Sequence, residues 1–379
     1  MPVRNFVSDS GNLNSYFGVP DGPSFGVYLR DIGFHKTSPC HNFGPAVRDY
    51  WLIHVIKSGK GWFMKSGVKT TLSAGDCFII RPMEVTTYCS DETDPWQYYW
   101  LGFQGEYAAK LAAFAGAAAV GGFIYLIAPG KIRKKQKSPF QNRNFAHRGL
   151  HKRDKSVPEN SLAAFERAAS YGYGIELDVQ LSKDGQVVVF HDDTLNRVCG
   201  VDARVDSKTL AELQQLSLCG TDETIPLFSD VLKTVRGRGA IIVELKNGKR
   251  NKELCEKTYA LLRRYTGDYC IESFNPFIVR WFKINAPEVV RGQLANPPKD
   301  YNGEVKPVTG FILGNVLLNF LARPQFIAYK IAPKPFPVKL CEALGAMKVC
   351  WTSHEWANEK GNDTVIFEFY KPKLKFNKR

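Results

Sequence analysis

The sequence predicts an α/β protein in which a (β/α)8 barrel comes after a smaller all-β domain. Three observations support this prediction. From about residue 141 to the end of the 379-residue chain, apolar runs typical of strands alternate with longer runs typical of helices. The strand-like runs are apolar throughout, as parallel strands buried on both faces are. Before residue 107 the runs are shorter and are separated by turn residues alone, which is typical of an all-β fold.

Eight strand-like runs are the basis of the barrel prediction. They read NFAHRG, GIELDVQ, VVVFHD, AIIVELK, YCIESF, VVRGQL, FIAYK and KVCWT. Helical runs such as SLAAFERAASYG separate them, and a count of eight suggests a closed barrel over residues 141–379. Two features fit imperfectly. The link from GIELDVQ to VVVFHD is too short for a helical crossover, and TVIFEFY near residue 367 offers a ninth strand.

Residues 1–107 read as a small β-sandwich or β-barrel. Alternation around SGKG predicts a hairpin there, and SAGD and RPME mark further turns. His35 and His41 flank Cys40 in what reads as an exposed loop, because no second pair of metal ligands is near. His54 lies in an apolar run and is expected to be a core residue whose hydrogen bonds are satisfied.

Residues 108–140 read as an apolar helix and a basic linker. The run LAAFAGAAAVGGFIYLIA at 111–128 has no charge, and PGKIRKKQK comes after it. We expect a single weak membrane anchor here, and the alternative is a buried or amphipathic linker helix of a cytoplasmic protein. The sidedness stays open. The basic flank favours a cytoplasmic C-terminal domain, whereas an N-terminal domain that folds in the cytoplasm would require the reverse.

The net charge of +14 is unevenly spread along the chain. Ten Lys and Arg residues lie between Lys131 and Lys155, with Asp154 as the one acidic residue among them. Such a segment fits a membrane surface better than nucleic acid, and no nucleic-acid-binding motif accompanies it. The nine cysteines are scattered without a C-x-x-C pair, which predicts free thiols in a reducing compartment. The N-terminus lacks the apolar run of a secretory signal.

Polar residues recur where the predicted barrel strands end. They are His147 and Arg148, Glu176 and Asp178, His191 and Asp192, and Glu244 and Lys246. Barrel strands converge at their C-terminal ends on one mouth, and residues two apart on a strand face the same side, so these groups are expected to share one site. Three carboxylates in one opening repel one another unless a cation neutralises them. Oxygen ligands of this kind suit Mg²⁺ or Ca²⁺.

The remaining polar groups complete a site suited to cleaving a phosphodiester. His147 and His191 can act as an acid–base pair, since imidazole titrates near neutral pH. Arg148 and Lys246 can hold phosphate oxygens. A plainer interpretation, in which Lys246 forms only an ion pair with Glu244, stays open.

These residues lie in motifs that resemble the glycerophosphodiester phosphodiesterase family. The motifs are HRG at 147–149, PENSLAAF at 158–165, ELD at 176–178, SKDGQVVVFHDDTLNR at 182–197, VELK at 243–246, SF at 273–274 and WT at 351–352. The resemblance implies a TIM barrel of the phospholipase C-like phosphodiesterase type. It also implies metal-dependent hydrolysis of glycerophosphodiesters to sn-glycerol 3-phosphate and an alcohol.

The resemblance assigns a role to each site residue. By resemblance, the catalytic pair is His147 and His191, and the metal ligands are Glu176, Asp178 and Glu244. The resemblance implies substrate binding by Arg148, Lys246, Phe274 and Trp351, and support from Glu159, Asn160 and Asp192. Asp192 could equally be a helix cap, because HDDTL precedes a turn. The chain departs from the family at its end, where VIFEFYKPK replaces the usual closing Thr-Asp and the helix before it is shortened. This departure bears on activity more than on fold.

The N-terminal part resembles a different family. The runs GKGWFMKSGVKTTLSAGDCFIIRP and PWQYYWLGFQGEY resemble the sensor domain of AraC-type transcription regulators, a cupin jelly roll. The helical DNA-binding half that normally comes next in that family is missing here. The resemblance therefore implies a module that does not read nucleic acid and is either structural or ligand-binding, with a sugar-like molecule as the ligand expected in the second case.

The sequence supports three functional hypotheses. The leading one is a membrane-attached, metal-dependent glycerophosphodiesterase, and the alternative is a non-enzymatic ligand sensor with an inactive barrel. The third is a related lipid phospholipase or a phosphodiesterase acting on teichoic-acid-like polymers. The apolar run GFILGNVLLNFLARPQF at 310–326 is relevant to the choice, since it is either a buried barrel helix or a segment that dips into lipid at the barrel mouth.

Overall fold

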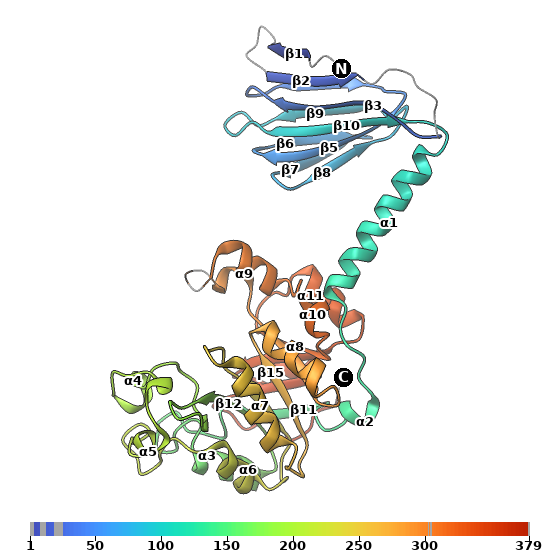
Figure 1. Ribbon diagram of the computed structural model, residues 1–379. Coiled ribbons are helices and arrows are strands. Elements are labelled where there is room, and N and C mark those ends of the chain that lie inside the picture. Colours follow the sequence, from blue (N-terminus) through green and yellow to red (C-terminus); the bar gives the residue numbers. More distant parts are fainter. Residues whose placement is uncertain (1–3, 8–12, 19–25, 302, 304, 378–379) are drawn as a thin grey trace. The chain divides into compact units, whose positions relative to one another are not determined.

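The computed structural model describes residues 4–7, 13–18, 26–301, 303 and 305–377 (Figure 1). The chain divides into two compact units, Met1–Gly121 and Gly122–Arg379. The division falls within helix α1 (Ala108–Ile127), inside the segment that the sequence assigned to an apolar helix and linker. All nine cysteines are free, as their scattered positions predicted.

The N-terminal unit is built of two antiparallel sheets, which confirms the predicted all-β domain. One sheet has the order β1 (Arg4–Val7), β2 (Leu13–Gly18), β3 (Tyr28–Lys36), β10 (Gln97–Gln104), β5 (Trp51–Ser58) and β8 (Cys77–Ile80). The other has the order β4 (Asn42–Ala46), β9 (Thr86–Ser90), β6 (Lys60–Lys65) and β7 (Val68–Ser73). Leu52 and Ile80 of the first sheet share a buried core with Tyr88 of the second, so the sheets pack face to face.

The predicted hairpin around SGKG is wrong. Strand β5 pairs with β10 and β8, whereas β6 pairs with β7 and β9, so the chain changes sheets at this turn. Gly59 occupies the turn with a φ of +76°, and a Cβ there would lie 2.5 Å from the carbonyl oxygen of Pro95, so the position requires glycine. The two-residue alternation indicated the strands correctly but could not indicate which sheet each joins.

The C-terminal unit is a closed barrel of eight parallel strands. They are β11 (Arg143–Ala146), β12 (Gly174–Leu181), β14 (Ile241–Leu245), β15 (Tyr269–Ser273), β16 (Val290–Ala295), β17 (Phe326–Lys330), β18 (Met347–Ser353) and β19 (Thr364–Phe367). Strand β11 pairs with both β12 and β19, which closes the ring. The predicted (β/α)8 barrel is therefore confirmed.

One of the eight predicted barrel strands lies outside the ring, and the run that looked like a ninth strand takes its place. The run VVVFHD contributes β13 (Val187–Val189), which pairs antiparallel with β12 and lies outside the closed ring. The run near residue 367, which looked like a ninth strand, is β19 and supplies the eighth position. The short link after β12 explains the difference, because it allows a hairpin but no crossover.

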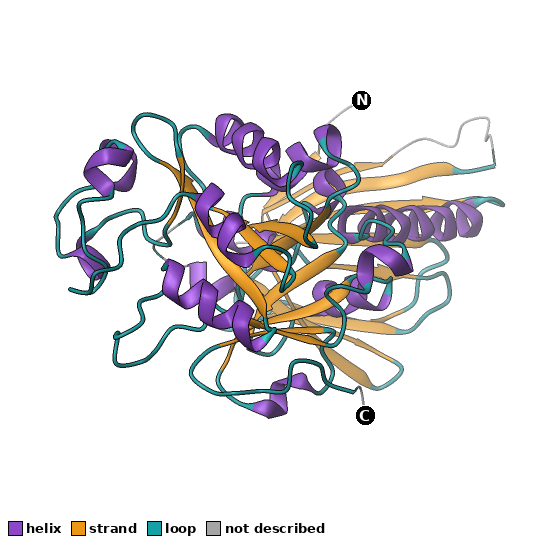
Figure 2. Ribbon diagram, turned by 90° about the horizontal axis from the view of Figure 1, so that it is seen from below, coloured by secondary structure: helices purple, strands orange, loops and turns teal. Residues whose placement is uncertain are grey.

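Helices cover the outside of the barrel (Figures 1 and 2). The principal ones are α3 (Leu162–Tyr171), α6 (Phe228–Val235), α7 (Asn251–Leu262), α8 (Pro276–Asn285) and α11 (Phe336–Ala343). In α3 the hydroxyl of Ser161 caps the first turn by accepting a bond from the Ala164 amide, and Gly172 ends the helix in the left-handed conformation. The stripe that α3 buries against the strands includes Phe165 and Ala168.

Shorter helices lie in the loops between these elements. They are α2 (Lys134–Lys137), α4 (Asn196–Cys199), α5 (Leu210–Leu213), α9 (Pro307–Gly314) and α10 (Asn319–Ala322), with the 3-10 turns η1 (Val205–Ser207), η2 (Pro298–Tyr301) and η3 (Trp356–Glu359). Helices α9 and α10 together form most of the run expected to be one apolar helix at 310–326. A turn between them breaks that run, so it is not a single buried helix.

Helix α1 is the one helix among the described residues that is long and apolar enough to cross a membrane. Only 6% of its most apolar window is buried. The membrane anchor stays a prediction, and so does its alternative, a buried or amphipathic linker helix. Its last residue, Ile127, is fully buried within the C-terminal unit, where the amide of Asn319 donates a hydrogen bond of 3.0 Å to its carbonyl oxygen.

Replacing Phe165 by Ala tests the packing of α3 against the barrel. The side chain is fully buried in the main core, so its truncation should lower the free energy of unfolding by about 3–5 kcal/mol. Urea-induced unfolding monitored by circular dichroism measures this loss. The matched control is Tyr171→Phe on the same helix, which keeps the half-exposed ring and its stacking on Tyr173 and should change the free energy of unfolding by less than about 0.5 kcal/mol.

Candidate active site

Three carboxylates meet at the mouth of the barrel. Glu176 and Asp178 lie two residues apart on β12 and so face the same side, and Glu244 of β14 stands directly beside Asp178 in the strand register. Each offers an oxygen atom, and these atoms all lie within 4.8 Å of one another. All three residues are buried, so the sequence was right to expect them in one opening.

The carboxylates of Glu176 and Asp178 differ in how much positive charge lies close to them. Burial raises the pKa of Glu176 well above its usual range, and the neighbouring Asp178 carboxylate adds to the effect. Burial alone would also raise the pKa of Asp178, but the positive charges of Lys246, His191 and Arg148 hold it well below its usual range. A cation close to Glu176 would remove the repulsion, and the oxygen donors of this group fit a hard divalent ion.

Lys246 lies against two of the carboxylates. Its Nζ is 2.8 Å from Glu244 Oε1 and 3.4 Å from Asp178 Oδ1. Burial would lower the pKa of Lys246, but the Glu244 and Asp178 carboxylates raise it, so this side chain is a fixed positive charge. The predicted plain ion pair with Glu244 therefore exists, and it lies inside the cluster rather than apart from it.

His147 comes directly after β11 and faces the cluster. Its Nε2 lies 3.9 Å from Glu176 Oε2, and its Nδ1 lies 3.4 Å from Glu368 Oε1. Burial lowers the pKa of His147, while the hydrogen bond with Glu368 opposes that shift. The geometry leaves Nε2 directed toward the carboxylates.

The sequence analysis missed Glu368 as a site residue. It comes directly after β19, and its carboxylate also lies 2.8 Å from His151 Nε2. Burial would raise the pKa of Glu368, but His147 and His151 hold it below its usual range. The sequence interpretation treated this end of the chain only as a departure from the family pattern. The signal was the same as at the other strands, a charged residue where a barrel strand ends.

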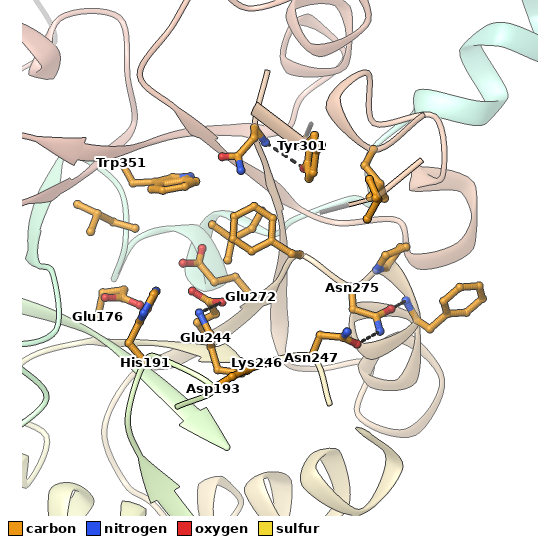
Figure 3. Close-up of a pocket in the computed structure, with 18 of the residues that line it drawn as sticks. Glu176, His191, Asp193, Glu244, Lys246, Asn247, Glu272, Asn275, Tyr301 and Trp351 are labelled. Carbon is orange, nitrogen blue, oxygen red and sulfur yellow. Dashed lines mark hydrogen bonds and ion pairs between the residues drawn. The ribbon is translucent and has the colours of Figure 1, made fainter. Parts of the chain in front are cut away.

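His191 lies beside Glu176 in the same mouth, with Glu244 and Lys246 next to them (Figure 3). Its Nδ1 is 2.6 Å from Asp192 Oδ1, so Nε2 is the ring atom free of that contact. Asp192 is in turn held by Arg197, whose Nε lies 2.6 Å from Asp192 Oδ2. Asp192 thus braces the histidine, one of the two roles that the sequence left open.

Arg148 and two neighbours hold the cluster in place. The backbone amide of Arg148 donates a 3.0 Å hydrogen bond to Glu176 Oε2, and its guanidinium donates one of 2.7 Å to Glu159. The amide of Asn160 donates a 2.9 Å bond to Asp178 Oδ2. Burial would raise the pKa of Glu159, but Arg197 and Arg148 lower it to about 2. The support predicted for Glu159 and Asn160 has this geometric basis.

A cavity of about 870 Å³ opens onto these groups. Phe274 and Trp351 both line it, with their ring centroids 5.8 Å apart in an edge-to-face arrangement. Tyr301 and Trp351 lie across the cavity from the charged cluster (Figure 3). The cavity wall also contains apolar residues, namely Leu294, Val305, Leu313, Leu318 and Ile366.

Glu272 is a second site residue that the sequence analysis missed. It lies in β15 beside Glu244, lines the cavity and is buried, and its Oε2 has no hydrogen-bond partner among the described residues. Burial raises its pKa well above the usual range. The interpretation of YCIESF used the Ser-Phe pair and ignored the glutamate two residues before Phe274.

The fold and the site define a class of (β/α)8 barrels that gather a carboxylate cluster and two histidines at the mouth. The sequence profile of the Glycerophosphoryl diester phosphodiesterase family matches residues 147–369, more than half of the chain, so the chain belongs to this family. The profile of the AraC-like ligand binding domain matches residues 32–122. Both resemblances seen in the sequence are thereby confirmed.

Individual relatives agree with both assignments. The chain is 36% identical to the glycerophosphodiester phosphodiesterase of Caldanaerobacter subterraneus over 161 residues, which are 39% of this chain and 65% of that protein. It is 33% identical to the Msm operon regulatory protein of Streptococcus mutans over 101 residues, which are 26% of this chain and 36% of that one. The matches thus span less than two thirds of these relatives.

One solved structure gives the same fold for the barrel. It is an Oleispira antarctica phosphodiesterase in complex with the product sn-glycerol-3-phosphate. The similarity has a TM-score of 0.50 and 25% sequence identity, and it covers 61% of this chain and 94% of that chain.

The N-terminal unit has a cavity of its own, with a volume of about 590 Å³. Four polar atoms buried in its wall have no hydrogen-bond partner among the described residues: Asp31 Oδ1, His35 Nε2, Arg48 Nη1 and His54 Nδ1. Aromatic rings of Tyr50, Tyr88, Tyr98 and Trp100 complete the wall. Such a wall offers hydrogen bonds and stacking surfaces to a small polar ligand.

Two expectations about the histidines of this unit are wrong. His35 does not lie in an exposed loop but is buried in β3, and His41 joins it in lining the cavity. His54 is buried as expected, yet its Nδ1 has no hydrogen-bond partner among the described residues. The sequence gave no sign that a cavity lies between the sheets.

Replacing Glu159 by Gln should make the stability less dependent on pH. The lowered pKa of Glu159 means that its ion pairs stabilise the fold above about pH 4.5 and lose that effect as the pH falls toward about 2. We expect the wild type to exceed Glu159→Gln by about 1–3 kcal/mol in unfolding free energy at pH 7. That gap should shrink as urea titrations are repeated at lower pH. Glu256→Gln, at an exposed position, is the control and should show a gap below about 0.5 kcal/mol at every pH.

Proposed function

We propose that the chain hydrolyses glycerophosphodiesters to sn-glycerol 3-phosphate and an alcohol with the help of a bound divalent metal. The observation that carries this proposal is the convergence of three carboxylate oxygens within 4.8 Å, beside His147 and His191. Membership of the phosphodiesterase family supports the reaction type. The product named for the Oleispira antarctica phosphodiesterase supports sn-glycerol 3-phosphate as a product here.

Glu176, Asp178 and Glu244 would hold the metal, which we propose to be Mg²⁺ or Ca²⁺. When bound, it would supply positive charge next to the phosphate and its developing negative charge. The buried, charge-crowded environment of Glu176 supports this assignment, since a cation would offset both the burial and the repulsion there.

The two histidines divide the proton transfers between them. The lowered pKa of His147 favours its neutral ring, so Nε2 accepts a proton from the attacking nucleophile while Glu368 fixes Nδ1. His191, oriented by Asp192, donates a proton to the departing alkoxide. Lys246 and Arg148 hold the phosphate by charge, and Phe274 and Trp351 bound the substrate channel.

His147→Ala and His191→Ala should each lower kcat for glycerophosphocholine by about 10²-fold or more. The measurement is alcohol release in the presence of Mg²⁺ or Ca²⁺, with His41→Ala in the N-terminal unit as the histidine control. Retained turnover in both variants, or turnover that survives chelation of divalent metal, would refute the proposed mechanism.

Metal binding should be measurable without any turnover. Titration calorimetry with Ca²⁺ or Mg²⁺ should detect one site, and Glu176→Gln should weaken binding by about tenfold or more, because it removes one charged ligand. Asp193→Asn is a matched control, since Asp193 lines the same cavity but lies outside the carboxylate cluster. Equal affinity in the wild type and Glu176→Gln would contradict the assigned metal site.

We also propose that the N-terminal unit binds a small sugar-like ligand. The four unpartnered polar atoms and the aromatic wall support this, as does the match to the AraC-like ligand binding domain. A purely non-enzymatic sensor would need an inert barrel, and the intact set of carboxylates, histidines and cations argues against that alternative.

Sugar binding can be tested by titrating the chain with a panel of mono- and oligosaccharides. Trp100→Ala should weaken the binding of whichever sugar produces heat by about tenfold, because it removes a stacking surface. Val68→Ala, at an exposed strand position, is the control. A sugar that binds the wild type and Trp100→Ala equally well would place its site elsewhere.

A further inference from the structure

An arginine with an unused donor lies in the wall of the cavity between the two sheets of the N-terminal unit. Arg48 follows β4, and its Nη1 is buried without a hydrogen-bond partner among the described residues. Its guanidinium carbon lies 4.4 Å from the centroid of the Phe43 ring, and its Nη2 donates a long hydrogen bond of 3.4 Å to the hydroxyl of Tyr88. These contacts hold the guanidinium at the cavity, but neither of them neutralises its charge.

Asp31 is the one carboxylate among the residues that line this cavity. Burial raises its pKa, and hydrogen bonds from Tyr50 and Trp100 oppose that shift. The charge of Arg30, which is outside the lining, also opposes it, and does so more strongly than Arg48. Asp31 is therefore compensated mainly by its own neighbours. Its Oδ1 has no hydrogen-bond partner among the described residues and can accept a bond from a ligand hydroxyl.

Two buried imidazoles each present one ring nitrogen to the cavity. His35 of β3 is held through Nδ1, which lies 3.0 Å from the hydroxyl of Tyr98, and its Nε2 has no partner among the described residues. His54 of β5 stacks on Phe78 with ring centroids 4.5 Å apart, and its Nδ1 likewise has no partner within that part of the chain. Both side chains are more than nine-tenths buried, so each ring is fixed and each of these nitrogens needs a ligand atom to satisfy it.

The charges of the wall favour an anionic ligand. Burial lowers the pKa of His35 to about 4 and that of His54 to about 3, so both rings are neutral at pH 7. Arg48 and His35 lie close enough to His54 for their charges to lower its pKa further. Arg48 is then the one lining residue that is always positively charged. A neutral sugar would bury that guanidinium without a counter-charge, whereas an anionic group would form a charge-assisted hydrogen bond with Nη1.

We propose that this cavity binds a small polyol that carries one anionic group, a phosphate or a carboxylate. The inference rests on the ligand site proposed for the N-terminal unit and specifies the chemical class of its ligand. The anionic group would lie at Arg48 and accept hydrogen bonds from His35 and His54, and a hydroxyl of the polyol would donate to Asp31. sn-Glycerol 3-phosphate, the product proposed for the barrel, belongs to this class. The N-terminal unit would then recognise a product that the same chain releases.

Hydrogen–deuterium exchange of the full wild-type chain, read by mass spectrometry, tests this and also locates the binding. sn-Glycerol 3-phosphate or glucuronate should slow exchange in peptides from residues 28–58, which include β3 and β5. Either compound should do so at concentrations at least about tenfold below those that glycerol or glucose requires. Peptides of the two units are read separately, so product bound in the barrel does not affect the comparison. Inorganic phosphate is the control for the polyol part and should require at least about tenfold more than sn-glycerol 3-phosphate.

Arg48→Gln tests the role of the charge. It should raise the concentration of sn-glycerol 3-phosphate that protects residues 28–58 at least about tenfold, because the charge-assisted hydrogen bond is lost. It should leave kcat for glycerophosphocholine within about twofold, since Arg48 does not line the barrel cavity. Arg81→Gln is the matched control, because Arg81 is exposed in the same unit and does not line either cavity, and it should change neither value. Circular dichroism checks that both variants are folded.

The inference and the proposals it builds on fail in different ways. If glucose or glycerol protects residues 28–58 as well as the anionic compounds do, or if Arg48→Gln binds sn-glycerol 3-phosphate as tightly as the wild type, the anionic class is wrong and a neutral sugar remains the proposed ligand. Equal protection by inorganic phosphate would refute the polyol part. If no compound slows exchange there, the ligand site itself is wrong. Turnover of glycerophosphocholine decides the function of the barrel independently of all these outcomes.

Discussion

The mouth of the barrel is governed by one electrostatic constraint, the close approach of buried carboxylates. Parallel strand register brings them together, since Asp178 stands beside Glu244 and Glu244 stands beside Glu272. Lys246 and Arg148 compensate only part of this charge: the pKa of Asp178 is held low, while burial and its neighbours raise the pKa of Glu176. Because the protein's own cations balance only part of this buried negative charge, the site favours the binding of a cation from solution.

The surrounding loops hold this charged cluster in place by a further set of ion pairs. Arg197 links Glu159 to Asp192, and through Asp192 it fixes the ring of His191. Directly after β19, Glu368 fixes the ring of His147. Each imidazole thus has one nitrogen bound to a carboxylate and the other directed at the site, which is the condition for directed proton transfer. The loops therefore orient the two imidazole rings, and the strands carry the buried carboxylates.

Features set by local periodicity were predictable from the sequence, whereas those that depend on spatial neighbours were missed. Glu176 and Asp178 were predictable, because residues two apart on a strand face the same side. The exchange of roles between β13 and β19 was predictable only in part: the short link after β12 excludes a crossover there, but which strand takes the eighth place is set by the whole ring. Glu272 and Glu368 obey the same rule as the predicted carboxylates, at strand ends, but their environment became visible only with the barrel closed. The cavity between the two sheets of the N-terminal unit left no local pattern at all.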